Sequence, residues 1–109
     1  MAKLVRDNIP ALIRVSGRTP IVRQLEDDEF AAALLDKLDE ETAELRSAAT
    51  AEAVLEEAAD VLEVLAAIVE RHGYGLSDII AAADEKRLSR GGFATRCWLE
   101  SGGAVTASS

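Results

Sequence analysis

Two long segments rich in alanine and leucine, from about residue 28 to 47 and from about residue 50 to 72, constrain the fold most strongly. Alanine, leucine and glutamate all favour the α-helix. The stretch "SAAT" interrupts the pattern and offers Thr50 as an N-cap for the second segment. We therefore predict an all-α fold whose centre is a pair of long helices joined by a short turn.

Shorter elements are predicted around this pair. "NIPALIRVSG" indicates a brief helix. "DIIAAADEKRLSR" indicates a further helix, which ends at Gly91 and Gly92. Alternation of apolar and polar residues predicts minor short strands near residues 20–25 and 93–99. We expect one domain over residues 1–100, followed by a disordered tail over residues 101–109, which is small and polar.

The charge balance excludes several classes of function. The 109 residues carry 20 acidic and 12 basic side chains, a net charge of −8, whereas proteins that bind nucleic acid usually have the opposite sign. No apolar run approaches a membrane span, and "MAKLVRDNIP" has charges where a signal peptide needs an apolar core. With one cysteine, Cys97, no intrachain disulfide is available. We expect a cytoplasmic protein without nucleic-acid or membrane partners.

Acidic residues interrupt the apolar face of each long helix. In the first helix one stripe follows from steps of about 100° per residue, and its apolar members are Phe30, Leu34, Leu38 and Leu45. Glu41 falls inside this stripe, with Lys37 and Glu44 along its edge. The second helix has a wide apolar arc of Val54, Ala58, Val61, Leu62, Leu65, Ile68 and Val69. Glu57 and Asp60 lie at the margin of this arc.

The four acids form two matched pairs. Glu41 with Glu44, and Glu57 with Asp60, are each spaced i, i+3, so both carboxylates of a pair lie on one face. A single misplaced glutamate is most simply a solvated side chain, but the repetition in both helices weakens that explanation. In an antiparallel hairpin the four carboxylates converge, and like charges repel and raise one another's pKa. A Mg²⁺ ion, which prefers oxygen ligands and retains positions for phosphates, resolves this conflict.

The third predicted helix becomes basic in its last turns. Its inner face of Leu76, Ile79 and Ala83 continues into basic residues, which are Lys86, Arg87 and Arg90. Favourable interaction with the C-terminal end of a helix is one explanation. The other is contact with a polyphosphate, because cations opposite a carboxylate cluster are what such a substrate requires.

These motifs together resemble a known superfamily. "EExxE", here Glu40, Glu41 and Glu44, precedes "ExxD", here Glu57 and Asp60, as in the all-α nucleoside triphosphate pyrophosphohydrolases. The flanking motifs "KLVRDNIP" and "EKRLSRGGFATR" resemble the MazG-like subgroup described as phosphoribosyl-ATP pyrophosphohydrolase-like, or as predicted house-cleaning pyrophosphatases. The resemblance covers residues 3 to about 99.

The resemblance implies Mg²⁺, with Mn²⁺ as a substitute, held by the four acids Glu41, Glu44, Glu57 and Asp60. It implies cleavage between the α and β phosphates to a nucleoside monophosphate and pyrophosphate. Glu41 or Glu40 is the candidate proton acceptor. Phosphate contacts are assigned to four basic residues, Lys37, Lys86, Arg87 and Arg90. Arg6 and Asp7 complete either the site or a subunit contact.

Alternatives remain at this point. Within the same superfamily, phosphoribosyl-ATP hydrolysis in histidine biosynthesis is the neighbouring activity, and the "KLVRD" opening favours the MazG-like subgroup over it. A different class is a non-catalytic module that binds nucleotide or oligomerises. The resemblance implies a helical bundle completed by oligomerisation, and the wide apolar arcs of so short a chain also favour a homodimer or homotetramer.

Overall fold

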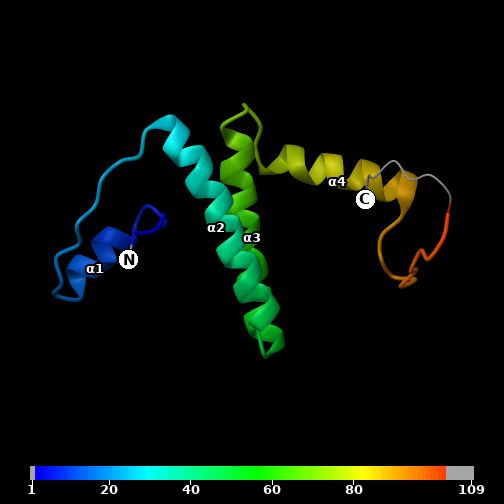
Figure 1. The fold of residues 1–109 in the computed structure, drawn as a ribbon, viewed down its shortest axis with the longest axis horizontal. Helices are drawn as coiled ribbons and strands as arrows, with labels where there is room; N and C mark the ends of the chain where they lie inside the picture. The colour runs from blue at the N-terminus through cyan, green and yellow to red at the C-terminus, as the bar shows by residue number, and fades with distance from the viewer. Residues whose placement is uncertain (1, 103–109) are drawn as a thin grey trace. The chain divides into compact units, whose positions relative to one another are not determined.

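The two long helices predicted at the centre are present. In the computed structural model, which describes residues 2–102, they are α2 (Asp27–Ser47) and α3 (Ala51–Glu70), and they run antiparallel side by side (Figure 1). Two further helices occur in this range, α1 (Ile9–Val15) and α4 (Leu76–Arg90). The described part of the chain is therefore all-α.

Local hydrogen bonds determine where the long helices begin. The backbone N–H of Glu26 donates to Glu29 Oε1 at 3.3 Å, which satisfies one of the donors at the start of α2. Thr50 is the N-cap of α3, as predicted, because its Oγ1 accepts from the Ala53 N–H at 3.1 Å. Just beyond α3, Gly73 adopts a φ of 85°, a conformation that glycine reaches without the strain of a Cβ.

A small core lies between α2 and α3. Leu34 from α2 and Val64 from α3 are 3% and 8% exposed, and Glu41 is 6% exposed beside them. The predicted stripe on α2 is thus confirmed, with Glu41 as a charged member of it. The predicted arc on α3 is only partly buried, since Val54 and Leu62 remain exposed.

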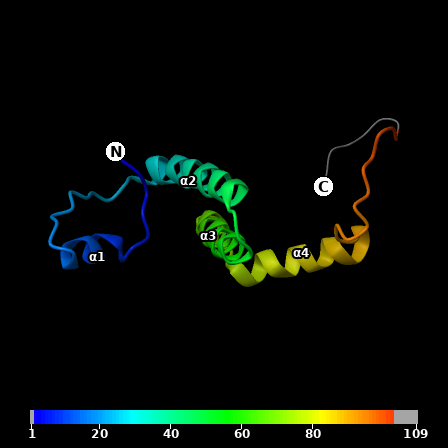
Figure 2. The same ribbon diagram turned by 90° about the horizontal axis from the view of Figure 1, so that it is seen from below.

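The described residues form two compact units. The first extends to Leu76 and contains α1, α2 and α3; the second begins at Ser77 and contains most of α4 and the segment after it. Figure 2 shows the same ribbon after a quarter turn, with α2 and α3 again adjacent. A search of the described helices for one long and apolar enough to cross a membrane finds none.

The prediction of strands near residues 20–25 and 93–99 was wrong. Neither segment forms a strand, and both run as irregular backbone. An alternating pattern makes a strand only where a neighbouring strand pairs with it. In the second segment a turn intervenes, because the Arg96 N–H donates to the Phe93 carbonyl at 3.1 Å and Arg96 has a φ of 56°. Of the predicted tail, residues 103–109 lie outside the described residues.

Candidate metal centre

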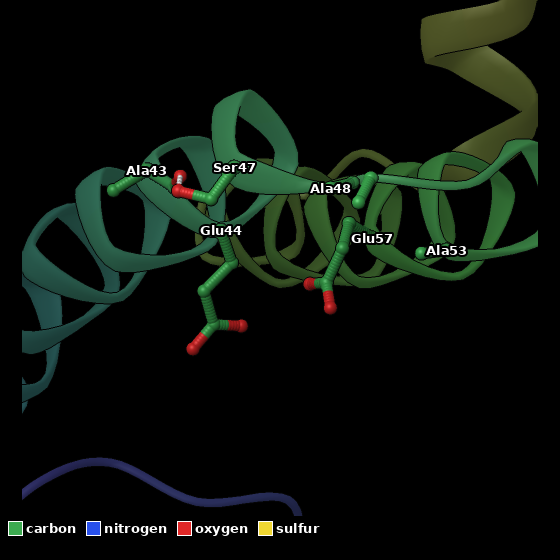
Figure 3. A pocket seen from close by; sticks show the side chains of 7 residues that line it. Ala43, Glu44, Ser47, Ala48, Ala53 and Glu57 are labelled. Atoms are coloured by element: carbon green, nitrogen blue, oxygen red, sulfur yellow. Dashed lines mark hydrogen bonds between the residues drawn. The ribbon is translucent and has the colours of Figure 1, made fainter.

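Three of the four predicted acidic ligands lie close together. Glu41 and Glu44 from α2 and Glu57 from α3 each offer one carboxylate oxygen, and these oxygens lie within 4.8 Å of one another. Figure 3 shows the side chains of Glu44 and Glu57 extending from their two helices to the same side of the hairpin. The i, i+3 spacing on α2 and the antiparallel packing of α3 therefore bring three of the acids together, whereas the sequence predicted that all four would converge.

Two oxygens of this group are buried without a partner. Glu41 Oε2 and Glu57 Oε2 are inaccessible to solvent and accept no hydrogen bond from the part of the chain that the structure describes. An unpaired carboxylate oxygen is costly to bury. The group contains only carboxylate oxygens, the donors that Mg²⁺ prefers. The donor set and the two unpaired oxygens thus fit a hard divalent cation.

Electrostatic repulsion is concentrated on Glu57. Burial raises the pKa of Glu57 above the ordinary glutamate value, and the neighbouring carboxylates of Glu44, Asp60 and Glu41 raise it further. This is the shift expected of a carboxylate that loses water and faces like charges. A divalent cation among these carboxylates would reverse the effect by favouring the ionised form.

Lysine lies against the same cluster from within α2. Lys37 Nζ is 3.3 Å from Glu41 Oε1 and 3.4 Å from Glu40 Oε2. Burial alone would lower the pKa of Lys37, but the hydrogen bond to Glu41 and the adjacent Glu40 carboxylate outweigh burial and raise it. Lys37 is therefore held as a cation beside the candidate ligands.

Asp60 lies apart from the three clustered glutamates. It is half-buried one turn beyond Glu57, and its Oδ1 accepts a hydrogen bond from Arg6 Nη2 at 2.6 Å. Lys3 Nζ lies 3.9 Å from Glu40 Oε1, so the segment before α1 is joined to both long helices. The spacing of the acids gave no indication of these contacts. Arg6 and Asp60 are 54 residues apart in sequence, and no local periodicity links them.

Two hollows adjoin the acidic cluster. One, of about 470 Å³, lies at the α2–α3 turn and is lined by Glu44, Ser47, Glu57 and four alanines (Figure 3). The other, of about 430 Å³, lies between the segment before α1 and the helix pair. Its lining includes Arg6, Asp7, Lys37, Glu41 and Asp60 together with apolar side chains. Asp7 thus lies beside the candidate site within the first unit.

The remaining predicted phosphate contacts lie in the second unit. Lys86, Arg87 and Arg90 are exposed residues of α4, within its last two turns. Gly91 follows with a φ of 81°, and its N–H donates to the Arg87 carbonyl at 2.8 Å. The helix therefore ends at the glycine pair, as predicted.

Part of this chain is similar to a known protein. An uncharacterized protein of Mycolicibacterium smegmatis is 68% identical to this chain over 56 residues. These residues make up 51% of this chain and 57% of the relative, so the match spans little more than half of either protein. No family model matches the chain, and no solved structure matches it.

Proposed function

We propose that the protein is a Mg²⁺-dependent nucleoside triphosphate pyrophosphohydrolase of the MazG-like all-α kind. Its reaction is hydrolysis between the α and β phosphates, giving a nucleoside monophosphate and pyrophosphate, and its role is house-cleaning of modified nucleotides in the cytoplasm. The observation that carries the proposal is the convergence of Glu41, Glu44 and Glu57 oxygens within 4.8 Å. Two of these glutamates hold a buried, unpaired oxygen, Glu41 Oε2 and Glu57 Oε2.

The residues divide into ligands and proton acceptor. Glu41, Glu44, Glu57 and Asp60 hold the cation, which neutralises phosphate charge and lowers the pKa of a water when bound. Glu40 is the better placed proton acceptor, because it lies next to Glu41 in sequence and is only half-buried. Its carboxylate also contacts Lys37 and Lys3, which hold it beside the acidic cluster.

Basic residues are the proposed partners of the substrate phosphates. Lys37 is fixed beside Glu40 and Glu41, so it offers positive charge to a phosphate without a large rearrangement. The resemblance also implies phosphate contacts for the three basic residues near the end of α4, which are Lys86, Arg87 and Arg90. Charge stabilisation of this kind is the main task of a protein in phosphoryl transfer.

Oligomerisation belongs to the same proposal. Steps of 100° place Leu55 and Leu62 on one side of α3 and Val64 on nearly the opposite side. Val64 is buried, whereas Leu55 and Leu62 are 72% and 42% exposed. A helix that is apolar on two sides normally has both covered. A second copy covering the exposed side makes a homodimer, and pairing of dimers makes a homotetramer.

The test is a panel of nucleoside triphosphates, including oxidised, methylated and deoxy forms and phosphoribosyl-ATP, incubated with Mg²⁺ and assayed for pyrophosphate. We expect release of pyrophosphate that stops in chelator. Glu41→Gln should lower turnover at least ~100-fold, while Glu56→Gln, an exposed acid of the same helix pair, should not. Absence of product across the panel, with the chain folded and Mg²⁺ present, would refute the proposal.

A further inference from the structure

Arg6 forms an ion pair with Asp60, which is the fourth proposed ligand of the divalent ion. Arg6 Nη2 lies 2.6 Å from Asp60 Oδ1. Asp60 is missing from the set of acids whose oxygens lie within 4.8 Å of one another, although it is one helical turn from Glu57. Asp60 is therefore engaged by Arg6 instead of joining the other three carboxylates.

The contact is of a kind that can be exchanged. The Arg6 and Asp60 side chains are 55% and 38% exposed, and one short hydrogen bond joins them. Exposed pairs of this kind are weak, because water competes for both charges. A divalent cation held by three other carboxylates carries twice the charge of a guanidinium. It therefore competes effectively for the Asp60 oxygens.

Released from Asp60, Arg6 would still line a hollow that a phosphate can enter. Arg6, Lys37 and Asp60 all line the hollow of about 430 Å³ between the segment before α1 and the helix pair. Guanidinium groups pair well with phosphate oxygens. A phosphate that entered this hollow would meet both Arg6 and Lys37.

We propose that Arg6 is an exchangeable counterion: it occupies Asp60 in the cation-free protein and moves to a substrate phosphate when the cation takes Asp60. This rests on the proposed function and deepens it, because it makes Arg6 a positioning residue for the triphosphate. Arg6 then opposes binding of the bare cation and favours binding of the polyphosphate. A residue that merely supports the fold would not act on the two ligands in opposite directions.

The experiment measures both affinities in Arg6→Met, with Arg14→Met, an exposed arginine of α1, as the matched control. Electron paramagnetic resonance reports binding of Mn²⁺ alone, and calorimetry in saturating Mg²⁺ reports binding of inorganic tripolyphosphate. We expect Arg6→Met to bind Mn²⁺ about fivefold more tightly and tripolyphosphate about fivefold more weakly. Arg14→Met should match the wild type in both.

A double variant shows whether Arg6 acts through Asp60. Mn²⁺ should bind Arg6→Met/Asp60→Asn as weakly as it binds Asp60→Asn, because the competition has been removed in both. The inference is overturned if Arg6→Met binds Mn²⁺ no more tightly than the wild type, or loses affinity for both ligands. In that case the wild type still binds Mn²⁺ and still hydrolyses nucleotide, so the proposed function is retained. A wild type that binds no Mn²⁺ instead overturns the proposed function as well.

Discussion

Lys37 and Glu41 form an ion pair within α2, with 3.3 Å between Nζ and Oε1, and both side chains are largely buried. The pair lies beside the Leu34 core, so Glu41 is compensated on one oxygen by Lys37 while its Oε2 has no partner. A helix of this amphipathic kind normally buries an aliphatic side chain at such a position. The fold thus buries the negative charge of Glu41 with only one oxygen paired, and the proposed divalent ion would pair with the other.

Lys37→Met should destabilise the cation-free protein. The change leaves Glu41 buried without its counter-charge, and losing a hydrogen bond to a charged group costs about 2 kcal/mol. Urea unfolding in chelator at pH 7 measures the free energy of unfolding, and Arg46→Met, an exposed arginine of the same helix, is the control. Saturating Mg²⁺ should reduce the difference in the free energy of unfolding between Lys37→Met and the wild type. Equal unfolding midpoints for Lys37→Met and the wild type in chelator would contradict this account.

Glu57→Gln should stabilise the cation-free protein in a pH-dependent way. The pKa of Glu57 is raised in the folded state by burial and by Glu44, Asp60 and Glu41. Ionised Glu57 therefore costs stability at pH values above that raised pKa. As the pH falls through the raised pKa toward the ordinary value of 4.5, the wild type takes up its proton and the cost disappears.

The measurement is thermal melting in chelator across this range of pH. Glu57→Gln should have the higher midpoint at pH 7.5, and its advantage should vanish on acidification. Glu56→Gln, the exposed neighbour, provides the control for loss of one negative charge. In Mg²⁺ the order should reverse at pH 7.5, because the wild type gains stability from the bound ion and the variant lacks a ligand. A midpoint for Glu57→Gln below that of the wild type in chelator at pH 7.5 counts against the repulsion.

Helical periodicity predicted three members of the acidic cluster, Glu41, Glu44 and Glu57, because the face on which each lies is set locally. Glu41 falls within the Leu34 stripe at helical spacing, and Thr50 marks the turn, so two helices and the direction of their acids follow from short-range pattern. The position of Glu57 at the margin of the apolar arc was likewise predicted from helical periodicity. Its half-buried state follows from the face that α3 turns toward α2.

Other features depend on contacts that no period describes. On α3 the pattern predicted one wide core face including Val54 and Leu62, with Val64 at its margin, but Val54 and Leu62 are exposed, and the buried residues of α3 are Val64 and Ala66. A helix that is apolar on two sides does not specify which side meets its neighbour in the chain. The Arg6–Asp60 contact depends on the path of the segment before α1, and the predicted strands lack a strand to pair with. These three features all require tertiary information.

Removing a clustered glutamate should weaken binding of a divalent ion independently of any nucleotide. Glu41→Gln should bind Mn²⁺ about 10- to 100-fold more weakly than the wild type, because the group loses a charged and buried oxygen donor. Electron paramagnetic resonance of free Mn²⁺ during titration gives the dissociation constants. Glu52→Gln, an exposed acid in the first turn of α3, should retain wild-type affinity. The same affinity for Glu41→Gln and Glu52→Gln would place the ion elsewhere on this acidic chain.

Adding a charge to the exposed apolar side of α3 should dissociate the oligomer. Leu55 is 72% exposed and lies on the same side as Leu62, so in the proposed dimer both side chains are covered by a second copy. Leu55→Glu would bury an unpaired carboxylate there, and an interface does not tolerate that cost. Sedimentation velocity at micromolar concentration should give a dimer or tetramer for the wild type and a monomer for the variant. Ala32→Glu, on the side of α2 opposite Leu34, adds the same charge and should leave the assembly unchanged. A wild type that sediments as a monomer would refute the proposed dimer. An unchanged assembly in Leu55→Glu would show that this side of α3 is not the interface.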